Sequence, residues 1–273
     1  MLPPVNLIDT TKGRYLLFAS RDIISSHLYH NGQWEPLTVA IATALISSAK
    51  PVGGVVIDAG ANQGAFTIPL ARELPASISF HCFEVQRIIF YQLCGNVFVN
   101  RLQNVYTHQT ALGDRVGAVQ VPVPDYNEDI NCGGVSVNEN VRKLRNHQRT
   151  DINCTTFEEV DLRPLDVFSF EDVRLLKIDV EGMELEVLRG AHRMIETNNF
   201  PPVLFELWNE ATMPAFVDQN QSVINHLIGL GYHVQRIGEL GIAQFGGRPR
   251  IQFDFDATKG ALKLSIVVPD AAT

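Results

Sequence analysis

Residues 55–68, VVIDAGANQGAFTI, decide the fold of this chain. An uninterrupted apolar run, Val55–Ile57, leads into the acidic residue Asp58 and then into two glycines. This pattern predicts a buried strand, a tight turn and the start of a helix. Apolar runs without alternation are typical of parallel strands covered by helices on both faces. We therefore predict a doubly wound α/β domain whose ligand lies at the carboxyl end of this strand.

The spacing of the two glycines bears on the ligand. Gly60 and Gly64 let the backbone turn sharply and approach a ligand closely. A dinucleotide turn has the pattern G-x-G-x-x-G, whereas here Asn62 stands in the place of the second glycine. The spacing therefore weakens a pyrophosphate interpretation and favours another nucleotide-like ligand. A purely structural strand-to-helix turn is the alternative.

A second acid follows the next predicted strand. Residues Ser79–Phe83 form that strand, and Glu84 ends it after one β-α-β unit. A carboxylate at this place can accept hydrogen bonds from a ribose diol. Asp58 and Glu84 thus end two neighbouring strands, which makes a ligand site more probable than either acid does alone.

The fourth predicted core strand, Leu175–Asp179, carries an unusual lysine. Lys177 and Asp179 lie two residues apart and therefore share one face of the strand. A lysine in a central strand is unfavourable unless it is paired or borders a wet cleft. Glu181 follows at the start of the next predicted helix, where it is either a catalytic acid or an acid favoured by the helix dipole.

The other predicted elements surround this centre. They are a hairpin arm at Tyr15–Ala19, helices at Leu37–Ser48, Gln86–Asn100 and Gln221–Leu230, one helix from Glu181-Gly182 through Ile195, strands at Val105–Ala111, Pro202–Leu207, Tyr232–Ile237 and Leu262–Val268, and an antiparallel arm at Val116–Val123. We expect residues 1–50 to form an N-terminal cap on a core of residues 51–273, with an insertion at about 115–153 on the substrate side.

Composition limits the class of protein. The 273 residues, 45% of them hydrophobic, suffice for one large α/β domain. The net charge of −8 argues against a nucleic-acid partner or an anionic membrane surface. Four cysteines without C-x-x-C spacing indicate free thiols in a reducing compartment. The start lacks the pattern of a signal peptide, and the longest apolar stretch, Val39–Ala49, is too short to span a bilayer, so we expect a cytoplasmic protein.

Two motifs resemble a known family. The first motif, together with LLKIDVEGMELEVLRGA at residues 175–191, is similar to the FkbM-type family of S-adenosylmethionine-dependent methyltransferases. The segment RDIISSHLYHNGQWEP at residues 21–36 also resembles that family, so the resemblance covers roughly Arg21–Tyr232. It implies a Rossmann-like, seven-stranded class I methyltransferase sheet, mostly parallel with an antiparallel last strand. It also implies O-methylation of a hydroxyl on a sugar, a lipid or a polyketide-like natural product.

The resemblance and the residues together assign roles. The expected cofactor-binding residues are Glu35, Asp58, Gly60, Asn62, Gly64, Glu84, Ala111 and Asp179. Glu84 would hold the ribose, Ala111 the adenine edge, and Asp58 with Gly60 the amino-acid end of S-adenosylmethionine. Glu181 is the candidate general base, Asp179 an orienting group and Lys177 its charge partner. Glu35 lies in a turn that either closes over the cofactor or serves only as a helix entry.

The remaining predictions concern the acceptor, a metal and the alternative functions. Residues Asp125–Asn153 combine asparagines with the cations Arg142, Lys143, Arg145 and Arg149, which suits a hydroxyl-rich or anionic small molecule, although a solvated helix face is the alternative. No metal is expected, because no spacing demands one for Asp179, Glu181 and Glu206. A nicotinamide-dependent oxidoreductase and an inactive cofactor-binding domain are the alternative functions, and a homo-oligomer is possible.

Overall fold

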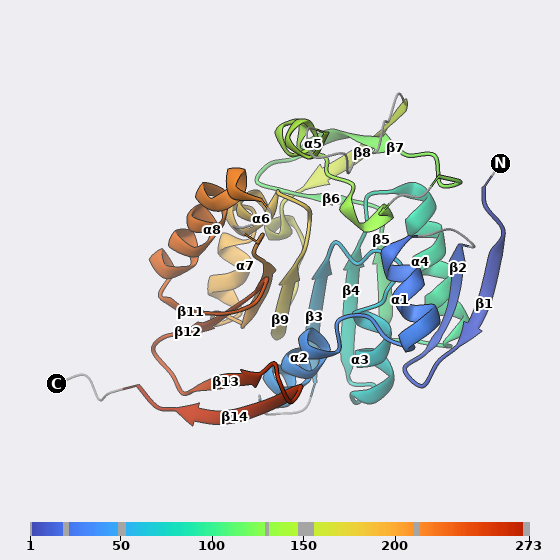
Figure 1. Cartoon of the computed structure of the whole chain (residues 1–273). Coiled ribbons are helices and arrows are strands. Elements are labelled where there is room, and N and C mark those ends of the chain that lie inside the picture. The colour runs from blue at the N-terminus through green and yellow to red at the C-terminus, as the bar shows by residue number, and fades with distance from the viewer. Residues whose placement is uncertain are drawn as a thin grey trace.

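A seven-stranded sheet with helices on both faces forms the centre of the protein (Figure 1). The computed structural model describes residues 2–18, 22–48, 53–128, 131–146, 156–209 and 213–269. The strands, in spatial order, are β11 (Tyr232–Ile237), β12 (Leu240–Phe245), β10 (Val203–Glu206), β9 (Val173–Ile178), β3 (Gly54–Ala59), β4 (Ile78–Phe83) and β5 (Val105–His108). Neighbours from β10 to β5 are parallel, and β12 is antiparallel to both of its neighbours. The predicted doubly wound sheet, mostly parallel with an antiparallel last strand, is confirmed.

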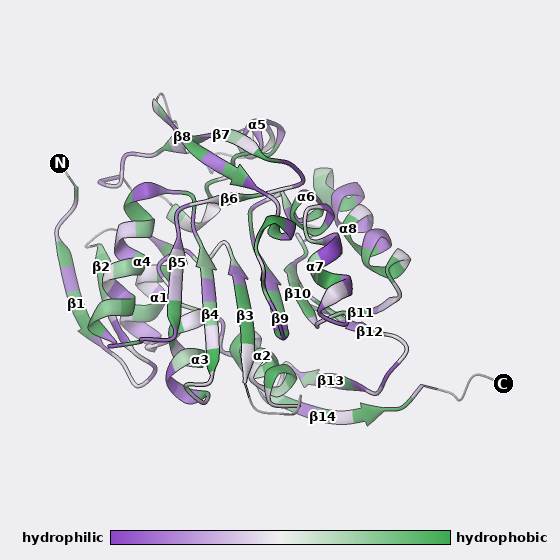
Figure 2. Cartoon of the chain, turned by 180° about the vertical axis from the view of Figure 1, so that it is seen from behind, coloured by the Kyte–Doolittle hydropathy of each residue, from purple (hydrophilic) through white to green (hydrophobic). Residues whose placement is uncertain are grey.

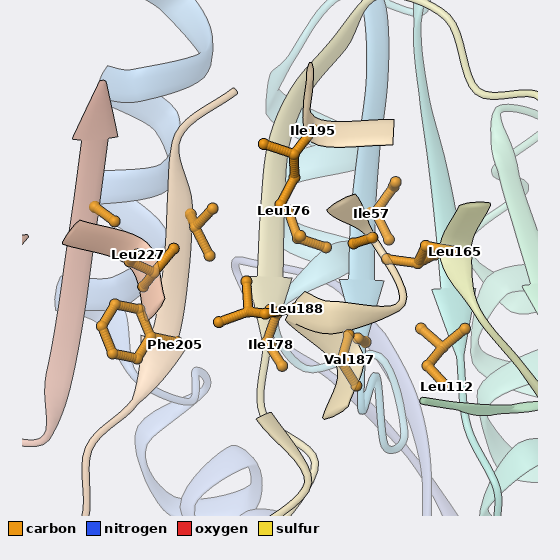
Figure 3. Packing of buried hydrophobic residues seen from close by; sticks show 14 of the residues in the cluster. Ile57, Leu112, Leu165, Leu176, Ile178, Val187, Leu188, Ile195, Phe205 and Leu227 are labelled. Carbon is orange, nitrogen blue, oxygen red and sulfur yellow. The ribbon is translucent and has the colours of Figure 1, made fainter. Parts of the chain in front are cut away.

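Successive strand residues point to opposite faces and bury against different helices. Leu175 and Leu204 pack in the cluster that contains α2, α3 and α4, whereas Leu176 and Phe205 pack against α6, α7 and α8. The helices are α2 (Pro36–Ser48), α3 (Thr67–Glu73), α4 (Arg87–Val99), α6 (Glu184–Arg189), α7 (His192–Thr197) and α8 (Val217–Gly229). Figure 3 shows the second of these clusters, with Leu188 and Ile195 against the sheet. Burial on both faces explains why the strands read as continuous apolar runs.

The helix expected from Glu181-Gly182 through Ile195 is two short helices, α6 and α7, so that prediction is wrong in its continuity. The chain breaks at Gly190, where a Cβ atom would lie 1.9 Å from the carbonyl oxygen of Gly113. Only glycine permits this approach of two backbones. The buried stripe nevertheless runs through both helices, because Leu188, Met194 and Ile195 all join one core cluster.

The N-terminal residues form a hairpin and a helix beside α4. The hairpin pairs β1 (Val5–Asp9) with β2 (Arg14–Phe18), which confirms the expected arm as far as Phe18, while Ala19 lies outside the described residues. Helix α1 (Ile23–Asn31), which the sequence analysis did not predict, begins at Asp22, whose carboxylate accepts a hydrogen bond from the Ser25 amide at 2.8 Å.

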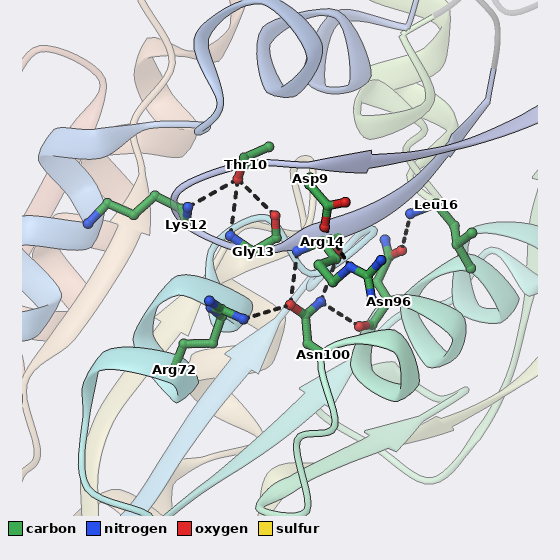
Figure 4. Close-up of polar contacts among 9 residues, drawn as sticks. All are labelled: Asp9, Thr10, Lys12, Gly13, Arg14, Leu16, Arg72, Asn96 and Asn100. Atoms are coloured by element: carbon green, nitrogen blue, oxygen red, sulfur yellow. Dashed lines mark hydrogen bonds and ion pairs between the residues drawn. The ribbon is translucent and has the colours of Figure 1, made fainter.

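Two asparagines hold this hairpin, Asn96 within α4 and Asn100 at the C-terminal cap of that helix (Figure 4). The Asn96 Oδ1 accepts a hydrogen bond from the Leu16 amide at 2.6 Å, and its Nδ2 donates to the Gln63 carbonyl at 2.9 Å. The Asn100 Oδ1 accepts one from the Arg14 amide at 2.9 Å. Asn96 is fully buried and therefore connects the hairpin to the loop that follows β3.

The Asn96→Ala substitution is expected to lower the free energy of unfolding by about 1–3 kcal/mol, because it leaves buried backbone groups without partners. Urea unfolding measures this change. Asn100→Ala is the matched control on the same helix, and its effect should be smaller because water can reach the groups it releases. Equal losses for the two variants would contradict the argument from burial.

The insertion builds a small second sheet. It comprises β6 (Ala111–Leu112), β8 (Thr156–Arg163) and β7 (Gly117–Val123), in that order, with β7 antiparallel to β8. The predicted antiparallel arm is therefore confirmed. Helix α5 (Glu139–Asn146) lies in the same insertion. The strand expected at Val105–Ala111 ends earlier than predicted, at His108, because Ala111 pairs with β8 and not with the central sheet.

The last part of the chain corrects another prediction. Residues Leu262–Val268 do not join the central sheet, because β14 (Ala261–Val267) pairs with β13 (Arg250–Asp256) in a separate hairpin. The central sheet is instead completed by β12, which a tight turn at Gly238, in the left-handed conformation, joins directly to β11. Figure 2 shows the separate hairpin beneath the central sheet, carrying both hydrophobic and hydrophilic residues.

Two further observations concern compartment and redox state. Among the helices that the structure describes, none combines the length and the apolar character needed to cross a bilayer. Cys82, Cys94 and Cys132 are free thiols, and Cys154 lies outside the described residues.

Candidate cofactor and acceptor site

A cavity of about 310 Å³ lies at the carboxyl ends of β3, β4 and β9. This volume falls at the lower end of the range for small-molecule sites. The structure brings together at its wall most of the residues predicted from sequence, namely Glu35, Gly60, Asn62, Glu84, Ala111, Lys177, Asp179 and Glu181. Asp58 and Gly64 are not among the residues that line it.

The turn after β3 depends on its first glycine. Gly60 has φ of 80°, and a Cβ atom there would lie 1.7 Å from the carbonyl oxygen of Asp179. No other residue can stand at this place without moving the neighbouring loop. Asn62 also has a positive φ, of 48°, which asparagine tolerates better than most residues.

Gly64 does not line the cavity, and its backbone has φ of 88°, a conformation that favours glycine. A Cβ atom at Gly64 would meet the side chains of Ile68 and Leu93 at 3.0 Å. This glycine therefore allows the turn to lie close to α3 and α4. The sequence motif could not separate the two roles, because glycine is required both for close approach to a ligand and for close packing of backbone.

Glu84 is held beside the cavity by the two loops that flank it. Its side chain accepts hydrogen bonds from the amides of Asn62 at 3.0 Å and Gln86 at 2.8 Å. Burial raises the pKa of Glu84 to about 7, although these hydrogen bonds act in the opposite direction. A carboxylate has capacity for further bonds beyond these two, so Glu84 can also accept hydrogen bonds from a diol.

Lys177 is the centre of a buried ion-pair network. Its Nζ lies 3.2 Å from both Asp58 Oδ1 and Asp179 Oδ2, and it donates to the Gly60 carbonyl at 3.2 Å. Burial alone would lower the pKa of Lys177, but the charges of Asp179 and Asp58 more than offset this effect, and Glu35 adds to theirs, so the pKa lies above its ordinary value. Lys177 is therefore a permanent cation and is not a base.

Asp58 lies beneath the cavity. It is fully buried, and it accepts a hydrogen bond from the Thr67 hydroxyl at 2.7 Å. The direct contact with the cofactor that the sequence analysis expected is therefore not what the geometry provides. Asp58 instead fixes Lys177, and Lys177 in turn fixes Asp179 at the cavity wall.

Three further carboxylates converge on the cavity wall. Ligand atoms of Asp179, Glu181 and Glu206 all lie within 4.8 Å of one another. Burial, followed by the charges of Glu181 and Asp179, raises the pKa of Glu206 well above its ordinary value, while the Trp208 ring nitrogen donates to it at 2.7 Å. A cluster of this kind can provide a general base, and its oxygens are also of the type that divalent cations prefer.

The loop that carries Glu181 is held on both sides. Glu181 has φ of 56°, a left-handed conformation that is unfavourable for a non-glycine residue. Its carbonyl accepts a hydrogen bond from the Ser136 hydroxyl at 2.6 Å, and the buried Glu184 side chain accepts from the amides of Val180 and Gly182. These contacts keep Glu181 at the cavity wall. Sequence reasoning missed Glu184, whose only signal was an acid in the first turn of a predicted helix.

The insertion supplies a wall of the cavity, and among its described residues no cation lines that wall. Asn131, Gly133 and Val135 line the cavity. Arg142 does not line it, because its guanidinium donates to the Ser136 carbonyl at 2.8 Å and lies over the Phe157 ring. The side chains of Arg145 and Arg149 lie outside the described part of the structure.

The charge of the described cavity wall is negative. Its acidic residues are Glu35, Glu84, Asp179, Glu181, Glu206 and Glu239, and its basic residue is Lys177. Burial and the negative charge of Asp179 raise the pKa of Glu35. Part of Glu35 is nevertheless exposed to solvent. A wall of this kind disfavours an anionic acceptor, contrary to the expectation drawn from the basic segment.

A second cavity of about 210 Å³ shares part of this wall. Both cavities are bordered by Glu35, Lys177, Asp179, Glu206 and Glu239. The second cavity continues between the start of α2 and the turn joining β11 to β12, where Leu37, Ile237 and Leu240 add an apolar surface. The acid cluster thus borders both cavities.

This sheet, with its strand order, its antiparallel β12 and a ligand-sized cavity beyond β3 and β4, has the class I methyltransferase fold. The chain belongs to the FkbM methyltransferase family, since the model of the methyltransferase FkbM domain matches residues 58–233. It is 31% identical over 154 residues to "Methyltransferase 1" of Beauveria bassiana (strain ARSEF 2860), covering 51% of this chain and 59% of that protein.

Solved structures are more distant. Methyltransferase FkbM from Methylobacillus flagellatus KT is 17% identical, with a TM-score of 0.46, over 70% of this chain and 44% of that chain. Precorrin-6y C5,15-methyltransferase from Geobacter metallireducens GS-15 is 12% identical, with a TM-score of 0.45, over 78% of this chain and 93% of that chain. The chain thus spans less than two thirds of the Beauveria protein and less than half of the FkbM structure.

Proposed function

We propose that this protein is an S-adenosylmethionine-dependent methyltransferase that methylates a hydroxyl group of a small molecule. The observation that carries the proposal is the placement of Glu84 and the cluster of Asp179, Glu181 and Glu206 on the wall of one cavity. Glu84 can hold a ribose, and the cluster of three carboxylates can receive a proton. Membership of the FkbM family supports methyl transfer as the reaction.

The residues around the cavity fit this cofactor. Gly60, Asn62, Glu84 and Ala111 line the cavity. In this proposal Gly60 and Asn62 would hold the amino-acid end of the cofactor, Glu84 would accept hydrogen bonds from the ribose, and Ala111 would lie beside the base. When bound, the cofactor supplies a methyl group on a positively charged sulfur, which is a good leaving group. The excess of carboxylates over Lys177 in the wall favours such a positive charge.

The acceptor hydroxyl must then be oriented and deprotonated. We assign Glu181 as the group that accepts the proton of the hydroxyl. Asp179 already forms an ion pair with Lys177. Glu206 has a raised pKa and accepts a hydrogen bond from Trp208. Asp179 would orient the hydroxyl, and Lys177 holds Asp179. The negative wall favours a neutral, hydroxyl-rich sugar, lipid or polyketide-like acceptor over an anionic one.

Isothermal titration of the purified protein tests the proposal. S-adenosylhomocysteine, the product of the cofactor, is expected to bind with a micromolar or lower Kd, and NADH is expected not to compete with it. Binding of NADH without binding of S-adenosylhomocysteine would overturn the proposal in favour of a nicotinamide-dependent oxidoreductase.

Affinity for S-adenosylhomocysteine is expected to rise about tenfold between pH 6 and pH 8, since a group with a pKa of about 7 is roughly one-tenth ionised at pH 6. The affinity should rise with pH because the ribose hydroxyls would donate hydrogen bonds to the ionised form of Glu84. Titrations at both pH values measure the effect. Glu84→Gln should weaken binding at pH 8 about tenfold or more and remove the pH dependence. If the dependence persists in that variant, it belongs to another group such as Glu35.

A further inference from the structure

The C-terminal hairpin of β13 and β14 has one closed edge and one open edge. It lies outside residues 58–233, which the family model matches, and Figures 1 and 2 show β14 on its outer side. The edge of β13 is closed by two glutamine side chains of the central sheet. Gln244 accepts a hydrogen bond from the Ile251 amide at 2.9 Å and donates one to its carbonyl at 2.7 Å. Gln235 makes the same two contacts with Phe253. Among the residues that the structure describes, β14 pairs with β13 alone, so its outer edge is open.

These contacts fix the direction of the backbone groups in β14. The N–H and C=O groups of Ile251 and Phe253 point to the glutamines and therefore away from β14. In an antiparallel pair, a residue opposite such a position also points its N–H and C=O away from the neighbouring strand. Ile251 lies opposite Ile266. Phe253 lies opposite Leu264, and Leu262 follows by alternation. All three of these β14 residues thus present backbone donors and acceptors at the open edge.

The side chains at this edge are apolar and exposed. Leu264 is 52% exposed and Ile266 is 75% exposed. Edge strands of monomeric proteins are usually protected by short length, by proline or by a bulge. Strand β14 is seven residues long, contains no proline and pairs with β13 without a register shift. It is therefore a template on which another strand can pair.

The sequence of β14, ALKLSIV, is complementary to itself. When two copies run antiparallel with Leu264 opposite Leu264, Leu262 of each copy lies opposite Ile266 of the other. Lys263, the one charged residue of the strand, then lies opposite Ser265, so no two like charges face each other. The three apolar positions are also those whose backbone groups point outward, so each can exchange both hydrogen bonds with its counterpart.

We propose that β14 pairs with β14 of a second copy of this chain, about a two-fold axis at Leu264. The two hairpins form one continuous antiparallel sheet, and the same surface of each copy takes part, as a two-fold dimer requires. The hairpin is remote from the cofactor cavity, because Ile251 and Ile266 border a separate cavity with Val173 and Pro202, at the starts of β9 and β10. The inference is therefore independent of the proposed reaction.

Sedimentation equilibrium of the full chain tests the pairing. The wild type is expected to form a dimer with a Kd in the micromolar range. Leu264→Lys places two lysines directly opposite each other and should raise this Kd about a hundredfold or more. Val116→Lys is the matched control, because Val116 is 59% exposed and lies outside the hairpin, so the Kd should not change. Thermal unfolding verifies that both variants are folded.

A pair of variants at Ser265, which is exposed, tests the register. Ser265→Glu would face Lys263 of the other copy twice in each dimer and should lower the Kd about three- to tenfold. Ser265→Lys should raise the Kd by a similar factor. Repulsion between whole molecules would give the opposite signs, because the chain has a net charge of −8.

Three results would overturn the inference. The first is a wild type that stays monomeric at about 100 μM, which would leave the open edge to a different chain. The second is a Leu264→Lys variant that dimerises as the wild type does, because the dimer would then use another surface. The third is a pair of Ser265 variants whose dissociation constants do not move in the expected opposite directions.

Discussion

Replacing Lys177 by methionine is expected to lower the free energy of unfolding by about 3–5 kcal/mol, because it leaves a buried charge without its partner. Asp58 is fully buried, and its Oδ1 faces Lys177 at 3.2 Å. Without the cation, Asp58 is left as an uncompensated buried charge.

Chemical unfolding at pH 7 measures this effect, and two controls identify its cause. Adding Asp58→Asn to Lys177→Met removes both charges, so the double variant should lose less stability than the two single variants together. Arg14→Met breaks an ion pair with Asp9 at the surface and should cost less than about 1 kcal/mol. If Lys177→Met costs no more than Arg14→Met, the network beneath the cavity is not important for stability.

Replacing Glu181 by glutamine is expected to slow methyl transfer by on the order of 10²–10⁴, the usual effect of losing a general base. Affinity for S-adenosylhomocysteine should change less than twofold, because Glu181 would act on the acceptor hydroxyl and not on the cofactor. The rate of S-adenosylhomocysteine formation with a hydroxyl acceptor measures the first effect, and calorimetric titration measures the second.

The neighbouring acids serve as controls for this experiment. Glu206→Gln should slow the reaction less, because the raised pKa of Glu206 already favours its neutral form. Glu171→Gln removes an exposed acid that does not line the cavity and should leave the rate unchanged. A Glu181→Gln rate within about threefold of the wild type would transfer the role of base to Asp179. Loss of wild-type activity in chelator, restored by a divalent cation, would instead assign the three carboxylates to a metal, which we do not expect.

The sequence by itself determined the architecture of the core. The uninterrupted apolar run Val55–Ile57 predicted a strand buried on both faces, and the two core clusters confirm it, because Ile57 packs in one and Val56 in the other. The resemblance to FkbM methyltransferases added the reversed last hairpin, which residue patterns alone do not show. The sequence analysis placed that last strand at Leu262–Val268, whereas the structure has it in β12, because local patterns do not say which strand a residue pairs with.

For the site, the sequence predicted which strand ends carry polar groups. Glu84 and Asp179 follow apolar strands, and parallel strands bring their carboxyl ends to one edge of the sheet. That argument needs only local sequence and the direction of the chain. It could not say that Asp58 points beneath the cavity towards Lys177, because side-chain direction at a strand end depends on the neighbouring strand and loops.

Only the tertiary structure decided which distant residues share the cavity. Glu206 reaches Asp179 because β10 pairs with β9, and Gln86 meets Cys132 because the insertion folds back over α4. The same folding turned Arg142 away from the cavity and onto the Ser136 carbonyl. Contacts between segments far apart in the chain leave no local pattern, so the polarity of the acceptor wall follows from the packing and not from the charge of any one segment.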